Sequence, residues 1–188
     1  MQEIIQKFLQ EASETLARMD AGQQARLAEA AGLLIDAFKR GGAVYVCGNG
    51  GSAADAQHIA AELAGRFLRE RPALACSALS TNTSVLTALG NDYSYDCIFA
   101  RQVEAYARPG DILWAISTSG NSKNVLEAVR SARQKGAAVL GFTGGEGGQL
   151  PGLCDVCFVA PAETTYAIQQ LHQVAYHILC DLVERAMA

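Results

Sequence analysis

The chain has little positive charge and no long hydrophobic run. Lysine and arginine together number 15 against 19 acidic residues, the formal net charge is -4, and the basic residues are scattered. Nucleic-acid backbones are bound by clustered Lys and Arg, so this composition argues against a nucleic-acid partner. No apolar stretch is long enough to span a membrane, and the segment after Met1 lacks the basic start and apolar core of a secretory signal. We therefore expect no membrane association and a cytoplasmic location.

The sequence also lacks a cysteine pattern typical of a disulfide framework. Its six cysteines lie mostly inside apolar runs, where thiols behave as small hydrophobic side chains. Cys154 and Cys157 have C-x-x-C spacing, but no second pair accompanies them to complete a zinc knuckle. We expect neither a metal nor a redox role at this pair. What the chain does have is 50% hydrophobic content over 188 residues, enough for a full core.

The order of apolar segments predicts one α/β domain over residues 1–188. Residues 1–40 carry apolar side chains at helical spacing with a break near Ala21-Gly22, which predicts two helices before any strand. Residues 41–188 alternate short apolar runs with helical segments, a pattern typical of a parallel sheet covered on both faces. The five expected strands are 43–47, 74–79, 112–116, 138–142 and 156–160.

Loops rich in glycine and hydroxyl groups follow three of these strands. In such a sheet, ligands bind beyond the carboxyl ends of the strands. Residues 117–122 contain four hydroxyl side chains and lead into a helix, where free amides and the helix dipole favour an anion. Capping of the helix is the alternative role for any single serine. The density of hydroxyls, without Lys or Arg, predicts a phosphate site built from uncharged groups.

The loop at residues 48–53 also fits G-x-G-x-x-A, the pattern of dinucleotide-binding enzymes. Those enzymes need an acidic side chain at the end of the second strand to hold the ribose hydroxyls. Here the second strand is followed by Ser80-Thr81-Asn82. The missing acid disfavours a nicotinamide cofactor.

Candidate acid–base groups lie on two helices. His58 and Glu62 are four residues apart on an alanine-rich helix, so they can contact each other or share a metal ion, with a surface ion pair or a satisfied core histidine as the alternative. The last helix has no formally charged residue from position 165 to 180, which indicates burial. Its polar stripe predicts a binding site, a subunit interface or an internal hydrogen-bond network, and His172 at the edge is expected to be structural. The stripe consists of Gln169, Gln173, Tyr176 and His177.

Several linked motifs resemble one known family over almost the whole chain. They are residues 48–58, 71–74, 90–93, 99–104 and 116–121. The chain is similar to the sedoheptulose-7-phosphate isomerases, or phosphoheptose isomerases, of the sugar isomerase (SIS) domain superfamily. The resemblance implies a flavodoxin-like three-layer α-β-α sandwich with a five-stranded parallel sheet. It also implies a homotetramer whose sites are completed by neighbouring subunits.

The same resemblance implies an aldose–ketose isomerase. The reaction would convert sedoheptulose 7-phosphate to D-glycero-D-manno-heptose 7-phosphate through an enediolate, for heptose and lipopolysaccharide synthesis, with Glu62 as the base and His177 as the acid. In metal-containing members zinc is held by four residues, all present here as His58, Glu62, Gln169 and His177. The substrate-binding positions that the resemblance implies are Asn49, Gly50, Gly51, Ser52, Arg66, Asn91, Asp92, Ser117, Thr118, Ser119, Ser122 and Gln169.

Two observations test the resemblance within the sequence. Asn82 stands where many members have Asp, and Gly145-Glu146 replaces a more usual charged pair, so the sugar contacts can differ in detail. The alternative function is that of a non-catalytic phosphosugar-binding or replication-initiator-binding SIS protein. The replication-initiator-binding relative lacks counterparts of Glu62 and His177, which are present here. A carboxylate and an imidazole supply the two proton transfers that an aldose–ketose isomerisation needs.

Overall fold

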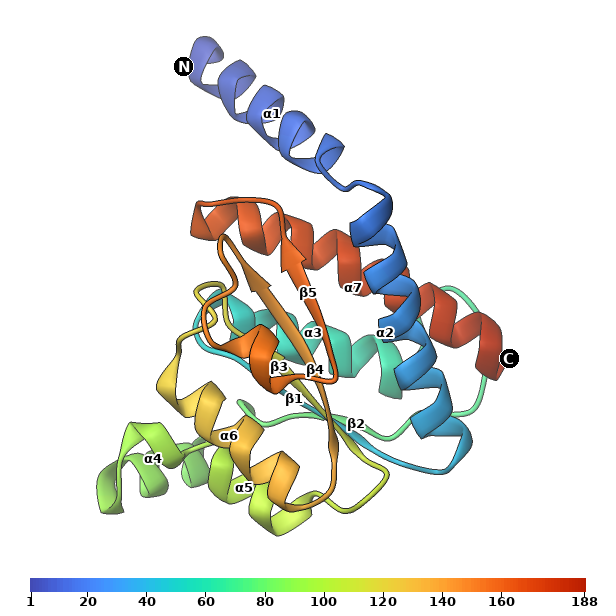
Figure 1. Cartoon of the computed structure of the whole chain (residues 1–188), viewed down its shortest axis with the longest axis vertical. Coiled ribbons are helices and arrows are strands. Elements are labelled where there is room, and N and C mark those ends of the chain that lie inside the picture. Colours follow the sequence, from blue (N-terminus) through green and yellow to red (C-terminus); the bar gives the residue numbers. More distant parts are fainter.

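Five parallel strands form the centre of the protein, in the order β2-β1-β3-β4-β5 (Figure 1). The computed structural model describes residues 1–188. The strands are β1 (Val44–Cys47), β2 (Cys76–Ala78), β3 (Ile112–Ile116), β4 (Ala138–Gly144) and β5 (Val156–Ala160). The helices are α1 (Gln2–Ala17), α2 (Ala21–Lys39), α3 (Gly51–Ala64), α4 (Thr83–Asp92), α5 (Ala100–Tyr106), α6 (Lys123–Gln134) and α7 (Thr165–Met187), with short 3₁₀ helices η1 (Tyr95–Cys97) and η2 (Leu150–Leu153). The predicted five-stranded parallel sheet is confirmed.

The sheet separates two hydrophobic cores because neighbouring residues of a strand point to opposite faces. In β3, Trp114 packs into the core under α2, α3 and α7, whereas Leu113 and Ala115 pack into the core under α5 and α6. Every residue of β3 is buried, as expected for the central strand of a parallel sheet. This arrangement is the predicted three-layer sandwich.

The first strand begins at Val44, one residue later than predicted, and two other strands differ by more. The second strand is confined to Cys76–Ala78, because Leu74 donates its N–H to the Leu63 carbonyl at the end of α3. The fourth strand is longer and reaches Gly144, since its last residues continue to pair with β5. Both differences arise from contacts between segments that are distant in the sequence.

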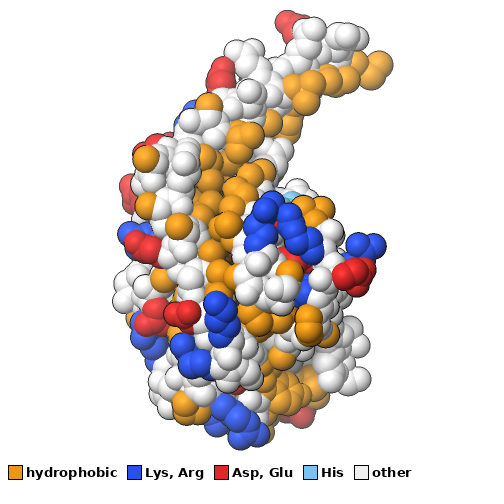
Figure 2. Space-filling model, turned by 90° about the vertical axis from the view of Figure 1, so that its right-hand side faces the viewer, with side chains coloured by type: hydrophobic (Ala, Val, Ile, Leu, Met, Phe, Trp, Pro, Cys, Tyr) orange, Lys and Arg blue, Asp and Glu red, His pale blue; other side chains and the backbone are white.

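The break between the two N-terminal helices lies slightly earlier in the chain than Ala21-Gly22, where it was predicted. α1 ends at Ala17, and the Asp20 side chain caps α2 by accepting the Gln23 N–H at 3.0 Å, so Gly22 lies inside the first turn of α2. α1 projects from the body of the protein (Figure 1). Figure 2 shows hydrophobic side chains that continue from this projecting helix onto the body. The exposed apolar residues of α1 are Ile4, Ile5, Phe8, Leu9 and Leu16.

The prediction that the last helix is buried is correct on one side only. Tyr176 and Leu179 of α7 are fully buried against α2 and α3, but Val174, Ile178 and Leu182 on the opposite side are exposed. The absence of charge therefore extends to a solvent-facing surface of the single chain. None of the helices combines the length and the apolar character that a membrane span requires.

Candidate active site

A polar pocket lies beyond the carboxyl ends of β1 and β3, where a ligand was predicted. It is lined by Asn49, Gly50, Gly51, Ser52, Ile116, Ser117, Thr118, Ser122, Thr165 and Gln169. Helices α3, α6 and α7 all begin at its wall, so their positive dipole ends converge on one cavity of about 260 Å³. No lysine or arginine lines it. An anion is the ligand that this pocket favours.

The first turn of α6 offers unused backbone donors to the pocket. The first helical hydrogen bonds run from Val125 and Leu126 to the Ser122 carbonyl, which leaves the amides of Lys123 and Asn124 without an acceptor. The Ser122 hydroxyl does not cap the helix; it accepts a hydrogen bond from the Ser117 hydroxyl at 3.0 Å. Two amides and the Ser122 hydroxyl are thus available to donate to a phosphate group.

A pair of asparagines joins the loop after β1 to the start of α6. Asn49 donates to Asn124 Oδ1 at 2.9 Å, and Asn124 donates back to Asn49 Oδ1 at 2.8 Å. The Tyr95 hydroxyl also donates to Asn49 Oδ1, at 3.1 Å. Asn124 is buried and did not emerge from the sequence, where it lies at the start of an ordinary amphipathic helix. The feature that marks Asn124 is a buried side-chain amide that is hydrogen-bonded through both its nitrogen and its oxygen, and this can be seen only in the structure.

Gln169 of α7 contacts the start of α3. A Cβ atom at Gly51 would lie 2.4 Å from Gln169 Nε2, so any larger residue there would displace the Gln169 amide. Gly50 has φ of 54°, a left-handed conformation that glycine adopts without strain. The structure therefore brings the predicted binding residues of the glycine loop together with Gln169.

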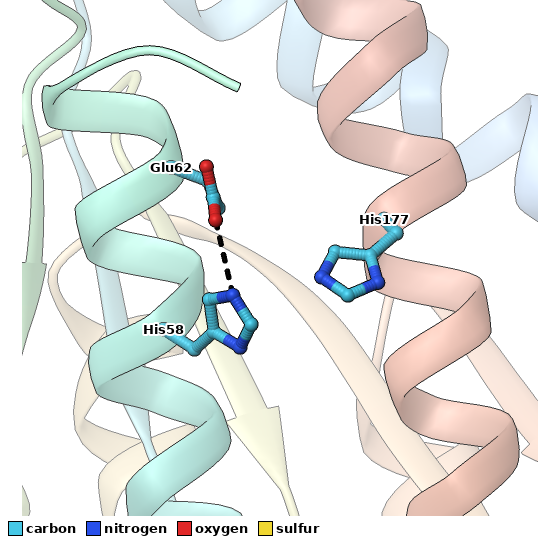
Figure 3. Close-up of side chains that lie close together, drawn as sticks. All are labelled: His58, Glu62 and His177. Atoms are coloured by element: carbon cyan, nitrogen blue, oxygen red, sulfur yellow. Dashed lines mark hydrogen bonds and ion pairs between the residues drawn. The ribbon is translucent and has the colours of Figure 1, made fainter. Parts of the chain in front are cut away.

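Three titratable side chains meet on α3 and α7 (Figure 3). His58 Nε2 and Glu62 Oε1 share a hydrogen bond of 3.0 Å, and the ring of His177 approaches the ring of His58 with centroids 5.0 Å apart. One ligand atom from each of the three lies within 4.8 Å of the others. The Glu62 side chain is 20% exposed, so it can be reached from solvent without being fully hydrated. This cluster can exchange protons or bind a metal ion.

Tyr176 fixes the orientation of His58 from within the core. Its hydroxyl lies 2.9 Å from His58 Nδ1, and burial raises the pKa of this tyrosine, so the hydroxyl stays protonated. When the hydroxyl donates to Nδ1, the proton of His58 is on Nε2 and faces Glu62. Burial also raises the pKa of the nearby Asp55 carboxyl, whose Oδ2 is buried without a partner. Sequence reasoning placed Tyr176 on the polar stripe but missed Asp55.

His177 lies between aromatic rings. The Phe67 ring stacks on it with centroids 5.4 Å apart and an interplanar angle of 9°. Burial and the neighbouring His58 lower the pKa of His177, so its neutral form is favoured. Phe67 is positioned by the buried Glu184, which accepts the N–H groups of Phe67, Leu68 and Arg69 at 2.7–2.9 Å. Glu184 was not predicted, because nothing in the sequence connects it to a loop more than a hundred residues away.

The pocket and the cluster lie along the same helix. Gly51 lies at the pocket and His58 two turns further on, which is about 10 Å along α3 at 1.5 Å per residue. Gln169 and His177 on α7 have the same order. An elongated ligand can therefore place an anionic group at the start of α3 and its other end at Glu62.

Some predicted binding residues do not line this pocket within one chain. Ser119 is exposed at the tip of its loop, where its hydroxyl accepts a backbone N–H of the same loop. Arg66 forms a surface ion pair beyond α3, and Asn91 and Asp92 are exposed at the end of α4. These four remain predictions. His172, expected to be structural, is fully buried and hydrogen-bonded to the Thr143 carbonyl at 2.9 Å.

Comparison with known proteins gives consistent results. Residues 7–144 match the SIS domain family. The chain is 53% identical over 187 residues to a phosphoheptose isomerase from Rhodospirillum rubrum, covering 100% of this chain and 99% of that protein. A solved phosphoheptose isomerase from Neisseria gonorrhoeae superimposes with a TM-score of 0.93 at 40% identity, over 98% of both chains. A second, from Francisella tularensis, gives 0.94 at 34% identity over 97% of both chains.

Proposed function

The chain belongs to the phosphoheptose isomerases of the SIS domain family and is an aldose–ketose isomerase of sugar phosphates, and from this premise we propose its substrate and mechanism. The proposed reaction converts sedoheptulose 7-phosphate to D-glycero-D-manno-heptose 7-phosphate. The observation that carries the proposal is the position of an uncharged anion pocket and a carboxylate–imidazole cluster on the same two helices. An elongated sugar with a terminal phosphate matches this separation.

The phosphate is bound at the pocket by the hydroxyls of Ser117, Thr118 and Ser122 and by the free amides of α6. Charge-assisted hydrogen bonds from hydroxyls and amides hold the anion in the field of three helix termini. Asn49 and Gln169 then face the sugar hydroxyls. Because the phosphate does not react, its binding energy orients the distant carbonyl end toward the proton-transfer groups.

Glu62 is the proposed base. Its Oε1 is occupied by His58, which leaves Oε2 to take the proton from C1 of the ketose. The electron pair of that C–H bond forms the enediolate, and Glu62 returns the proton to C2 to give the aldose. His58, held by Tyr176, fixes the carboxylate for both transfers.

His177 is the proposed acid. Because its pKa is lowered, it is a neutral imidazole near neutral pH, and its N–H can donate to the developing negative charge on the enediolate oxygens. The stacked Phe67 ring fixes the plane of the imidazole. Proton removal and oxygen stabilisation are thus assigned to side chains from two different helices.

His58, Glu62 and His177 also fit a zinc ion. Two imidazoles and a carboxylate form a donor set that zinc accepts in catalytic sites, and their ligand atoms are already close together. A bound zinc would polarise the carbonyl and enediolate oxygens as a Lewis acid. Gln169 is the predicted fourth ligand and lies two turns before His177 on α7. His58 would bind through Nε2, with its Nδ1 proton donated to the Tyr176 hydroxyl.

We further propose that the enzyme works as a homotetramer in heptose synthesis for surface glycans such as lipopolysaccharide. The exposed apolar residues of α1 and of the outer side of α7 support an assembly, because a single chain leaves them in water. A neighbouring subunit is then the natural route by which Arg66, Asn91 or Asp92 reaches a pocket that they do not line in their own chain. This part of the proposal depends on the family resemblance.

A coupled assay tests the function directly. Sedoheptulose 7-phosphate should be turned over, whereas fructose 6-phosphate and unphosphorylated sedoheptulose should react far more slowly. Tight binding of the heptulose phosphate without any turnover, by protein with and without added zinc, would instead favour a non-catalytic phosphosugar-binding protein.

A further inference from the structure

The two cysteines of the C-x-x-C segment meet above a glycine of the sheet. Cys154 follows η2, and Cys157 lies in β5 opposite Gly141 of β4. A Cβ atom at Gly141 would lie 2.5 Å from Cys154 Sγ and 2.9 Å from Cys157 Sγ, so both sulfurs occupy the space that the missing side chain leaves. The proximity of Cys157 and burial raise the pKa of the Cys154 thiol. C-x-x-C spacing alone did not predict this arrangement.

The pair can be reached from solvent. Both cysteines are half-buried and line an open hollow of about 510 Å³ between η2 and the start of α2, together with Asp20, Arg26 and Pro151. By contrast, Cys47, Cys76 and Cys180 are buried in the cores. Small oxidants therefore have access to two adjacent thiols at this place.

The surroundings do not complete a metal site. Asp155 is engaged through both oxygens, with Arg133 at 3.0 Å and the Val139 N–H at 2.7 Å. Asp20 Oδ1 caps α2. The three-ligand cluster of histidine and carboxylate lies elsewhere, on α3 and α7. Two thiols without further ligands are a poor zinc site, but both sulfurs lie within 2.9 Å of the same point above Gly141, which is the proximity that a disulfide requires.

We propose that Cys154 and Cys157 are a modification site, a dithiol that a peroxide converts to an intramolecular disulfide. The Cys157 thiolate attacks one peroxide oxygen, the O–O bond breaks, and a sulfenic acid and one water form. The Cys154 sulfur then displaces the hydroxyl group from Cys157, the S–S bond forms, and a second water leaves. Two thiols lose two electrons and two protons, and hydrogen peroxide is reduced to two waters.

Peptide mass spectrometry of the full-length protein tests this site. The reduced protein is exposed to a few equivalents of hydrogen peroxide, blocked with iodoacetamide and digested so that residues 154–157 are separated from Cys180. The peptide that holds both cysteines should lose two hydrogen atoms and take no alkyl group. A dithiol reductant should restore both alkylation sites.

Cys97→Ser is the matched control, because Cys97 is the other half-buried cysteine and its thiol donates to the Ser94 carbonyl. This variant should form the bridge as the wild type does, whereas Cys154→Ser and Cys157→Ser should not form it. The proposal is overturned if both cysteines still alkylate at a dose that oxidises Cys97. It is equally overturned if they oxidise separately to sulfinic acids or form bridges only between chains.

Discussion

The two ends of α3 differ in the kind of side chains around them: uncharged groups at one end and titratable groups at the other. At its N-terminus, the pocket attracts an anion with helix dipoles, hydroxyls and amides, and no ionisable side chain lines it. Two turns later, His58 and Glu62 are joined by His177, and the site consists of groups that gain or lose protons. The first region keeps the same charge over a wide pH range, whereas the second is built from side chains that can exchange protons.

This difference separates binding from chemistry. A phosphate held by neutral donors is bound equally in substrate, enediolate and product, so it contributes to affinity and orientation. In the proposed mechanism, the titratable cluster acts on atoms whose charge changes during the reaction, so it contributes to the rate. Changes in the pocket should therefore appear mainly in KM, and changes in the cluster mainly in kcat.

The largest expected effect is that of Glu62→Gln. The amide keeps the size of the side chain but cannot take a proton, so kcat should fall by about 10²–10⁴-fold while KM changes little. Steady-state kinetics on the coupled assay measures both constants. Glu127→Gln, on the exposed face of α6, is the matched control and should behave as the wild type. Full activity of a correctly folded Glu62→Gln protein would show that another group is the base.

His172 provides a reference for the comparison of the pocket with the cluster. It lies on α7 between Gln169 and His177 but belongs to neither region. Burial lowers its pKa to about 4 from an ordinary value of 6.5. Between these values the unfolded chain binds the proton more readily, so stability should fall as pH falls, by about 3 kcal/mol in total. Denaturant titrations from pH 7 to pH 4 measure this loss.

His172→Gln is the variant for that test. The glutamine amide can still donate to the Thr143 carbonyl but does not titrate, so the acid-dependent loss should become smaller while kcat and KM at neutral pH stay the same. A large fall in kcat instead would mean that His172 belongs to the reacting site.

The pocket should respond differently from the cluster. Ser117→Ala removes a buried hydroxyl that faces Ser122 and should weaken substrate and inorganic phosphate binding by about 1–3 kcal/mol, with kcat nearly unchanged. Ser119→Ala, the predicted contact at the loop tip, should act in the same direction. Ser84→Ala on the exposed surface of α4 provides the control. Unchanged phosphate affinity in both loop variants would contradict the proposed cradle.

The smallest effect is expected from zinc. Zinc at ten times its dissociation constant should stabilise the fold by about 1.4 kcal/mol, which corresponds to roughly 3–6 °C in melting temperature for a chain of this size. Removal of metal with a chelator should leave the protein folded. The shift should vanish in His58→Gln and persist in His172→Gln, and a shift of equal size in both would place the metal elsewhere.

More of the fold than of the site could be predicted from the sequence. Strands such as 112–116 are recognisable because a buried parallel strand is apolar on both faces, and the phosphate loop because its hydroxyls precede a helix. Asn124, Tyr176 and Glu184 act through partners 75 to 118 residues away, which no local pattern reveals. The burial of α7 was overestimated, because lack of charge does not distinguish a core from an apolar surface.

Exchange with solvent tests the central claim most directly. In the proposed mechanism, Glu62, a partly exposed carboxylate, carries a proton between C1 and C2 of the sugar. Turnover in D₂O should therefore place deuterium at C2 of the aldose, detected by proton NMR, and Glu62→Gln should lose exchange and turnover together. Complete conversion without any deuterium at C2, together with full turnover by Glu62→Gln, would contradict this mechanism, because it would indicate a hydrogen transfer that bypasses the carboxylate.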